Sequence, residues 1–550
     1  MKKSILFLLL SGSFYTLFSQ DNSTDFGQIH GNVQTDVQYY NEDSLIGAPV
    51  VPEKMLMNGF ANINFTRGNF AAGIRYESYL NALQGFPEGY RGTGIGYRYA
   101  TYAMDNLEVT AGNFYEQFGS GMILRAYEER QLGYDNAFDG FRLKYNPYRG
   151  VYLKTVYGKQ RLFFDQGPGI VRGIDGEIVL NELSDSLEMN MKTRITIGGS
   201  FVSKFQADNN TVYNLPQNVG AYAIRFNVNK GNWNLNAEYV HKDNDPSSVN
   251  NFIYQEGEAL LINSSYSQKG FGVSMSAKRI DNMDFRSDRA ETFQNLNINF
   301  LPALTKQHTY ALATIYPYGT ITTGEMAYQG ELSYKFKKGS LIGGKYGTRI
   351  FTNFSTVYNI QKDQVGDTPI GQEGTLGYES DFFTIGEDKF FQEFSVEISK
   401  KVSKKLKFTG SYINTEYNSD FIVGYRGLKG TVYANIFVLE TQYKIKPKHS
   451  IRSEIQLLKT EQHDGDWAMA LIEYTISPHY FVAVQDMYNY GNSDEEKQIH
   501  YPVLSAGYNN GTTRFAANYG RQRAGIFCVG GVCREIPASD GFTLSITSSF

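Results

Sequence analysis

Apolar and polar residues alternate with a period of two along most of this 550-residue chain. The segment 29–40 places Ile29, Val33, Val37 and Tyr39 on one face and five polar residues on the other. The same alternation recurs at residues 72–77, 95–99, 141–145, 222–228 and 233–239. Because successive side chains of a strand point to opposite faces of the sheet, this pattern predicts β-strands with one apolar and one polar face.

Composition narrows the class of protein that such strands can build. Aromatic residues make up 15% of the chain, with 14 Pro and 2 Cys, which excludes a disordered chain and a disulfide scaffold. After the first twenty residues, no run approaches the ~18 unbroken apolar residues that a membrane-spanning helix requires. A net charge of -4 gives no sign of a nucleic-acid partner. A large soluble β-protein and a membrane β-barrel remain.

The connectors between the predicted strands favour the barrel. Short turns lie at 67–69, 105–106, 229–232, 269–270, 337–339 and 509–511, and long polar segments lie at 41–53, 163–191, 281–322 and 354–385. Short periplasmic turns that alternate with long extracellular loops are typical of outer-membrane barrels, whose sheets close because unpaired amides are costly in hydrocarbon. We therefore expect one all-β domain, an antiparallel up-and-down transmembrane barrel of about 24 strands (22–26). A periplasmic turn near 183–188 is needed to keep the later turns on one side.

The N-terminal residues have the features of an export signal. Lys2 and Lys3 precede a short apolar run, and Ser19 stands before Gln20. These features predict a secretory signal peptide at residues 1–19, followed by the barrel at residues 20–550. The first predicted strand follows too closely for an N-terminal plug domain, and the expected location is the Gram-negative outer membrane.

The chain ends on an amphipathic strand. Phe542, Leu544, Ile546 and the terminal Phe550 share one face of the last nine residues, about the length of one membrane-spanning strand. A terminal Phe on such a strand resembles the signal that the outer-membrane barrel assembly machinery reads. The expected partners are therefore the outer-membrane lipid bilayer and, during biogenesis, that machinery.

The two cysteines lie close together in the sequence. Cys528 and Cys533 are separated by four residues, with Gly530-Gly531 at the centre. If the two glycines form a two-residue turn, the cysteines face each other with Cα atoms ~4.5–5.5 Å apart, within reach of a disulfide. Export through an oxidising compartment favours the bridge. We predict a structural disulfide on the extracellular side, with metal binding and redox catalysis as the alternatives.

A stretch dense in glycine and charge, residues 112–136, interrupts the alternation between two good strands. A barrel of about 24 strands has a lumen too wide for wall side chains to fill, so loops are expected to obstruct it. We expect the segment 113–139 to fold into the lumen through three acids, Glu128, Glu129 and Asp135. Their expected partners form a basic wall of five strand residues: Arg75, Arg98, Arg142, Lys144 and Lys154. The alternative is an ordinary solvated extracellular loop.

No residue pattern predicts an enzyme, a metal site or a cofactor. The sequence Gly119-Ser120-Gly121 lacks the spacing of a nucleophile elbow, which has glycine two residues to each side of the serine. The seven His are scattered without metal-ligand spacing. Segments 243–245 and 464–466 each contain two Asp but lack the rest of an EF-hand loop, so we expect solvated loop acids rather than calcium ligands.

Three stretches, residues 112–136, 301–310 and 530–537, together with the tail to Phe550, resemble a known family. It is an uncharacterised, porin-like family of outer-membrane barrels from the bacterial lineage that uses type IX secretion. The resemblance covers essentially the whole mature chain. It implies an outer-membrane location and no established activity, and it assigns no functional residues.

The sequence thus predicts a channel or transport-associated, porin-like barrel for hydrophilic solutes, because the polar faces of the strands would line the lumen. The alternative is a non-conducting barrel whose long loops serve an export or surface protein partner. A barrel-embedded hydrolase is the weakest interpretation, since no Ser-His arrangement supports it.

Overall fold

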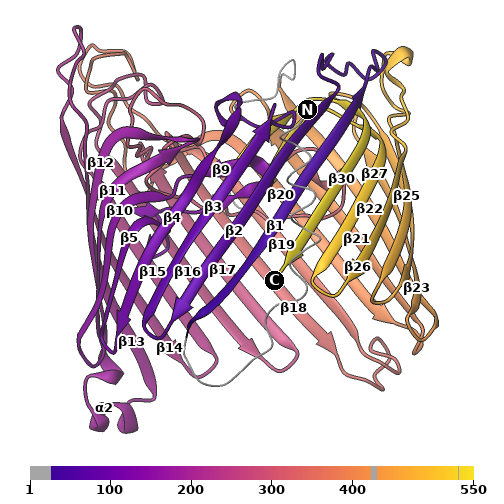
Figure 1. The fold of residues 1–550 in the computed structure, drawn as a ribbon, viewed down its shortest axis with the longest axis horizontal. Coiled ribbons are helices and arrows are strands. Elements are labelled where there is room, and N and C mark those ends of the chain that lie inside the picture. Colours follow the sequence, from indigo (N-terminus) through magenta and orange to yellow (C-terminus); the bar gives the residue numbers. More distant parts are fainter. Residues whose placement is uncertain (1–25, 423–429, 530–531) are drawn as a thin grey trace.

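The computed structural model describes residues 26–422, 430–529 and 532–550. Within these residues, 24 antiparallel strands form one closed sheet, which confirms the predicted fold class and strand number (Figure 1). The sheet closes where the first strand, β1 (Gln28–Asn41), pairs with the last, β30 (Ser539–Ser549). The predicted signal peptide, residues 1–19, lies outside the described residues.

Each wall strand pairs with the wall strands that precede and follow it in the chain. The other wall strands are β2 (Met55–Arg67), β3 (Phe70–Leu80), β4 (Gly92–Met104), β5 (Leu107–Phe114), β10 (Phe138–Tyr148), β11 (Val151–Leu162), β12 (Asp165–Val179), β13 (Thr193–Phe205), β14 (Asn218–Lys230), β15 (Trp233–Lys242), β16 (Gly257–Gln268), β17 (Phe271–Asp281), β18 (Gly324–Phe336), β19 (Thr348–Ile360), β20 (Ile385–Lys401), β21 (Leu406–Asn418), β22 (Thr431–Lys446), β23 (His449–Lys459), β24 (Trp467–Ile476), β25 (Tyr480–Tyr488), β26 (Val503–Asn510) and β27 (Thr513–Gln522). Tight turns join strands at 67–69, 105–106, 229–232, 269–270 and 509–511 as predicted, whereas the connection at 337–339 extends to 347.

The outer surface of the barrel is apolar. On β14, the outward Ile224 is 62% exposed, whereas the inward Val219 and Ala221 are fully buried. Exposed apolar side chains recur at alternate positions on strands around the sheet, for example Phe437 on β22 and Ile472 on β24. A closed sheet leaves no unpaired edge, and an apolar outer face suits hydrocarbon. The protein is therefore an integral barrel of the kind found in Gram-negative outer membranes.

Within residues 26–422, 430–529 and 532–550, helical structure is limited to short pieces. They are η1 (Glu88–Tyr90), η2 (Arg130–Leu132), η3 (Leu180–Glu182), α2 (Asp185–Asn190), η4 (Leu312–Thr314) and η5 (Glu495–Lys497). In the described part of the chain, no helix combines the length and apolarity needed to cross a membrane. The pair η3 and α2 forms the β12–β13 connection on the side of the tight turns, where a turn near 183–188 was predicted (Figure 1).

The segment 163–191, expected as one long loop, instead contains the wall strand β12, which Phe163-Phe164 joins to β11. The alternation is hidden because glycines occupy inward positions of β12. A Cβ atom at Gly169 would lie 2.0 Å from the carbonyl oxygen of Ser287, and one at Gly173 would lie 2.8 Å from the Phe118 ring. Glycine at these positions lets two segments inside the barrel approach the wall closely.

Candidate functional site

In the part of the chain that the structure describes, two segments leave the wall and occupy the lumen. The first inward segment, residues 115–137, connects β5 to β10. It forms two small hairpins, in which β6 (Gln117–Phe118) pairs with β7 (Leu124–Arg125) and β8 (Glu128–Glu129) pairs with β9 (Tyr134–Asp135). The second inward segment, residues 282–323, connects β17 to β18.

The first inward segment is packed against the inner wall. Phe118, Met122, Ile123 and Leu124 are fully buried in an apolar cluster that includes Val156 of β11 and other inward wall residues. Hydrogen bonds reach inward side chains of strands well apart in the sheet, from Arg75 on β3 to Glu238 on β15. The segment therefore lies inside the barrel, rather than in solvent above it.

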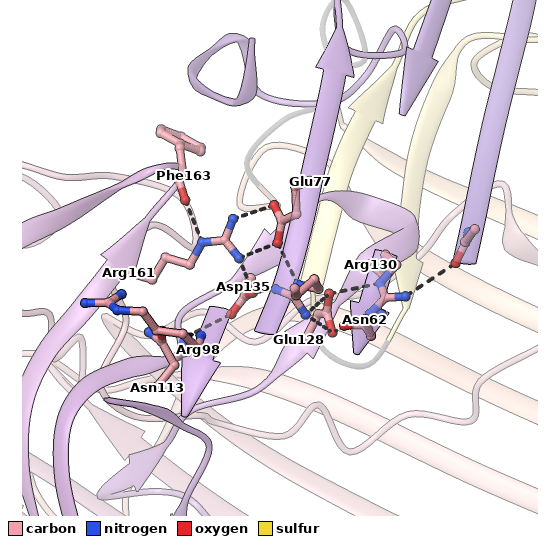
Figure 2. A network of polar contacts seen from close by, with 12 residues as sticks. Asn62, Glu77, Arg98, Asn113, Glu128, Arg130, Asp135, Arg161 and Phe163 are labelled. Atoms are coloured by element: carbon pink, nitrogen blue, oxygen red, sulfur yellow. Dashed lines mark hydrogen bonds and ion pairs between the residues drawn. The ribbon is translucent and has the colours of Figure 1, made fainter. Parts of the chain in front are cut away.

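A network of buried ion pairs, much of which is drawn in Figure 2, joins this segment to the wall through three arginines and three acids. The ion-pair network consists of Arg75 and Glu77 on β3, Arg161 on β11, and Glu128, Arg130 and Asp135 on the segment. Arg75 contacts Glu77 at 2.6 Å and Glu128 at 3.1 Å, and it also pairs with Asp135. Arg161 contacts Glu77 and Asp135, each at 2.6 Å. The six formal charges cancel, and such mutual pairing offsets the high cost of burying them.

A tyrosine of the segment supports the network. The Tyr115 hydroxyl donates to Asp135 at 3.1 Å. Burial raises the pKa of Tyr115 well above its usual value. The hydroxyl therefore stays protonated at neutral pH and remains a hydrogen-bond donor to the carboxylate.

The structure brings two of the three predicted acids, Glu128 and Asp135, to one of the predicted cations, Arg75. The third acid, Glu129, is half-buried, and in the described part of the chain it makes no ion pair with the predicted wall. Arg161, the second cation of the network that comes from the wall, was not predicted. It follows a β-bulge after Lys159, so its inward direction cannot be read from simple alternation.

Three other predicted cations converge on an acid that the sequence analysis did not select. Lys154 lies 3.1 Å from the Glu116 carboxylate, and Arg142 and Lys144 each lie 3.6 Å from it. Glu116 is buried at the start of the first inward segment. These wall cations therefore hold the segment through Glu116 rather than through Glu128, Glu129 or Asp135.

The fifth predicted cation, Arg98, does not face the lumen. The register of β3 with β4 pairs Arg75 with Tyr97 but Tyr76 with Ile95, so Gly96 is a bulge residue. Beyond the bulge, Arg98 lies opposite the outward-facing Ile74. Its side chain is 57% exposed and pairs with Asp139 at 3.0 Å. The assignment of Arg98 to the inner wall was wrong, because one extra residue exchanges the faces of a strand.

The second inward segment was expected to be an extracellular loop, yet it crosses the lumen. Met283, Phe285 and Ile298 are fully buried within it. His308 Nε2 lies 2.9 Å from Glu393 on β20, and the Leu312 amide donates to Gln456 on β23 at 2.8 Å. Its apolar residues at 301–304 and 312–318 were the signal that could have revealed it.

The two inward segments form one body, which we call the plug. The Arg125 amide donates to the Ile298 carbonyl at 2.8 Å, and the Phe300 amide donates to the Gly121 carbonyl at 2.9 Å. The Arg125 guanidinium also lies 4.0 Å from the centre of the Phe300 ring. The apolar cluster around the plug includes inward residues of strands from β10 to β25.

The plug closes one half of the lumen and leaves the other half open. On β22, the inward Val432 and Ala434 near the long loops are buried, whereas the inward Gln442 near the tight turns is exposed. On β13, Lys204 is fully buried and Thr196 is half-exposed. Since short turns mark the periplasmic side, the plug fills the extracellular half and a polar vestibule opens to the periplasm.

Half-exposed charges on the inner wall of this vestibule, from β12 to β24, are mainly acidic. The acids are Glu177, Glu331, Glu397, Glu440 and Glu473. Arg452 lies among them, 3.1 Å from Glu440 and 3.8 Å from Glu473. Lys407 on β21 is also half-exposed, and three exposed cations, Lys335, Arg349 and Lys401, lie nearer the tight turns. A polar cavity of about 380 Å³ lies at the β12–β15 side of the vestibule, next to Gly119 and Ser120 of the plug.

The whole chain, residues 1–550, matches the model of a protein family described as a family of unknown function, DUF6029. The chain belongs to this family. The expected membership of an uncharacterised family is thus confirmed at this level, and DUF6029 brings no activity with it. No curated protein matches the chain in sequence.

Several solved structures are similar to this DUF6029 chain. A mutant of the ferric enterobactin receptor PfeA from Pseudomonas aeruginosa has 12% identity and a TM-score of 0.41, covering 95% of this chain and 80% of that one. A BenF-like porin from Pseudomonas fluorescens Pf-5 has 9% identity and a TM-score of 0.32, covering 84% and 98%. OccD1 (OprD) has 10% identity and a TM-score of 0.35, covering 97% and 99%. At these scores, none of the likenesses bears on what the DUF6029 chain does.

The remaining predicted features of the chain lie in its loops. Strands β28 (Gly525–Val529) and β29 (Val532–Ile536) form a hairpin in which Cys528 lies opposite Cys533, as predicted. Their side chains fall outside the described part, so the disulfide stays a prediction. This hairpin rests on the plug, because Arg534 donates to the Gly133 carbonyl at 3.3 Å.

One acid in each of the segments 243–245 and 464–466 is paired with a lysine. Asp245 is buried and lies 2.6 Å from Lys204, so the expectation of a solvated acid was wrong there. Asp466 lies 2.5 Å from Lys459. Among the residues that the structure describes, no group of three or more His, Cys, Asp or Glu side chains is arranged to hold a metal ion.

Proposed function

We propose that the protein is a transport-associated outer-membrane barrel for hydrophilic solutes, closed at rest by its own plug, and that it is not an enzyme. The division of the lumen is the observation that supports this proposal. The extracellular half is filled by the two inward segments, and the periplasmic half is a polar vestibule. A barrel that served only to present loops would have no need for a charged, water-filled inner surface. Passage then requires movement of the plug.

The first inward segment is the part of the plug that a single substitution can displace. Gly173 faces the lumen between the buried Val156 and Val202, and a Cβ there would lie 2.8 Å from the Phe118 ring. Gly173→Val should therefore push the segment off the wall. Gly176→Ala is the matched control on the same strand, because its Cβ would meet only Leu153, at 3.3 Å on the outer face.

Planar bilayer recordings test the proposal. We expect rare, small conductance steps from the unsubstituted protein and from Gly176→Ala, and frequent, severalfold larger steps from Gly173→Val. Limited proteolysis of residues 115–137 reports whether the segment has moved. If Gly173→Val exposes the segment to protease and the barrel still does not conduct, the transport proposal is wrong.

A second candidate function is a non-conducting barrel that serves an export or surface protein. The apolar cluster that joins the plug to strands from β10 to β25 favours it, because a dry, well-packed interior resists opening. This candidate predicts no conductance from any variant and a stoichiometric protein partner that copurifies in mild detergent.

A further inference from the structure

The polar cavity beside the plug has the features of a binding site. It is lined by the inner faces of β12–β15 and by the turn Gly119-Ser120 of the first inward segment, and it is open to the vestibule. Its lining residues on the wall are Glu177, Thr196, Arg225, Asn227, Asn236 and Glu238. At about 380 Å³, it lies within the size range of small-molecule sites.

One carboxylate oxygen in this cavity lacks a well-placed donor. Glu238 is 1% exposed, and its Oε2 accepts a hydrogen bond from the Ser120 amide at 2.7 Å. Within the described residues, its Oε1 has no hydrogen-bond partner of good geometry, although the Ser120 hydroxyl lies beside the carboxylate. A buried carboxylate oxygen without a donor is costly, and native proteins satisfy most such atoms. The cavity therefore suits a ligand that supplies a donor to Glu238.

The neighbouring charges indicate that this ligand is a cation. Arg225 lies opposite Glu238 on the adjacent strand, but its guanidinium is 2.8 Å from both Asp175 and Glu177. Three carboxylates thus share one guanidinium, and Glu238 is the acid left without an ion pair in the described part of the chain. A cation would restore the balance of charge.

The donors and acceptors narrow the chemical class. A primary ammonium has three donors and no acceptor. The cavity offers it the free Oε1 of Glu238, the Glu177 carboxylate and the amide oxygens of Asn227 and Asn236. An anion would be repelled by these carboxylates, and a neutral sugar would leave the excess negative charge of the cavity unchanged.

We propose that this cavity binds a small organic cation with a primary ammonium group, which enters from the periplasmic vestibule. The inference deepens the proposed function by naming the class of solute, and the passage of that solute rests on the transport proposal. Binding at the cavity does not, because the site exists in the closed barrel.

The test is isothermal titration of the purified full-length protein in detergent with 1,4-diaminobutane. We expect saturable binding that Glu238→Gln weakens about tenfold or more, because a charge-assisted hydrogen bond becomes a neutral one. Glutamine retains an acceptor for the Ser120 amide, so the plug should stay seated. Glu331→Gln is the matched control, since Glu331 lies on the inner face of β18 outside the cavity and accepts from Ser274 at 3.0 Å.

A second variant tests binding at the cavity without changing the Glu238 carboxylate. Thr196→Phe fills the cavity from β13, leaves Glu238 in place and should abolish binding. The proposal is overturned if the unsubstituted protein shows no saturable binding, if Glu238→Gln or Thr196→Phe binds as tightly as it does, or if acetate or glucose binds equally well. Diamine binding without conductance from any variant would support this binding site and contradict the transport proposal. Conductance without diamine binding would contradict this binding site and support the transport proposal.

Discussion

At the scale of single residues, the ion-pair network attaches the first inward segment to the wall. Burying charged groups is costly, and the cost is offset only while every group keeps its partners. Arg161 serves two acids at once, Glu77 and Asp135, each at 2.6 Å. Loss of its guanidinium would leave both carboxylates with fewer cations in a dry environment.

Arg161→Met should therefore lower the free energy of unfolding by about 3–5 kcal/mol, the range for breaking a buried ion pair by removing one partner. Arg172→Met is the control on the adjacent strand. Arg172 is exposed and bonds only Asn218 among the described contacts, so the expected change is below about 1 kcal/mol. Urea unfolding of the barrel in lipid vesicles measures both. Equal losses for the two variants would contradict a structural role for the network.

The face of the sheet to which a side chain points was predictable from the sequence where strict alternation held. The prediction failed where one extra residue shifted the register. Arg75 and Arg98 look equivalent in the sequence, since each stands between apolar neighbours on a predicted strand. The bulge at Gly96 sends Arg98 to the outer face, and the bulge before Arg161 turns that side chain inward. A bulge depends on the pairing of two strands, so one strand's pattern does not reveal it.

At the scale of elements, the wall strands obey a local rule and the plug does not. Each strand needs only apolar residues at alternate positions, which the sequence displays directly. The second inward segment is buried through contacts with β20 and β23, distant in the chain, and its apolar residues follow no regular period. The glycines of β12 are likewise explained only by the segments that pack on them.

The last residue of the chain, next to the terminal strand β30, allows an effect on barrel assembly to be distinguished from an effect on the stability of the folded barrel. Phe550 is 64% exposed on the outer side of the closing seam, where its amide donates to Gly31 at 3.0 Å. A side chain so exposed adds little to the packing of the finished barrel. If it is instead read during biogenesis, Phe550→Ala should lower the yield of folded protein in the outer membrane severalfold.

Refolding of the same variant into detergent should proceed as for the unsubstituted chain, because no assembly machinery is present. Phe515→Ala is the control, with an outward, exposed ring on the adjacent strand β27. Heat-modifiable migration on gels measures the folded fraction in both settings. Equal yields of Phe550→Ala and Phe515→Ala in cells would show that the terminal ring carries no assembly signal.

At the scale of the whole molecule, the membrane constrains the wall of the barrel strongly enough to make it predictable. It places no such constraint on the contents of the lumen. Closure follows from the requirement that every backbone amide be paired in hydrocarbon, and the strand number follows from the runs of alternation along the chain. No comparable rule governs the interior, where wall cations on β10 and β11 are neutralised by the plug and most half-exposed charges of the opposite wall are acidic. The inner surface that stays accessible after folding therefore carries a belt of acids on β12 to β24, with exposed cations nearer the tight turns.

This distribution of charge predicts the ion selectivity of the opened barrel. In Gly173→Val, a KCl gradient should give a reversal potential that favours K⁺, because Glu331 and Glu397 lie on the inner wall with partly exposed carboxylates. Glu331→Gln combined with Glu397→Gln should reduce that preference, whereas Arg98→Gln, on the outer face, should leave it unchanged. The preference should also fade near 1 M salt, where the screening length falls to about 3 Å. Selectivity for Cl⁻, or a K⁺ preference that persists at high salt, would show that these acids do not control the path.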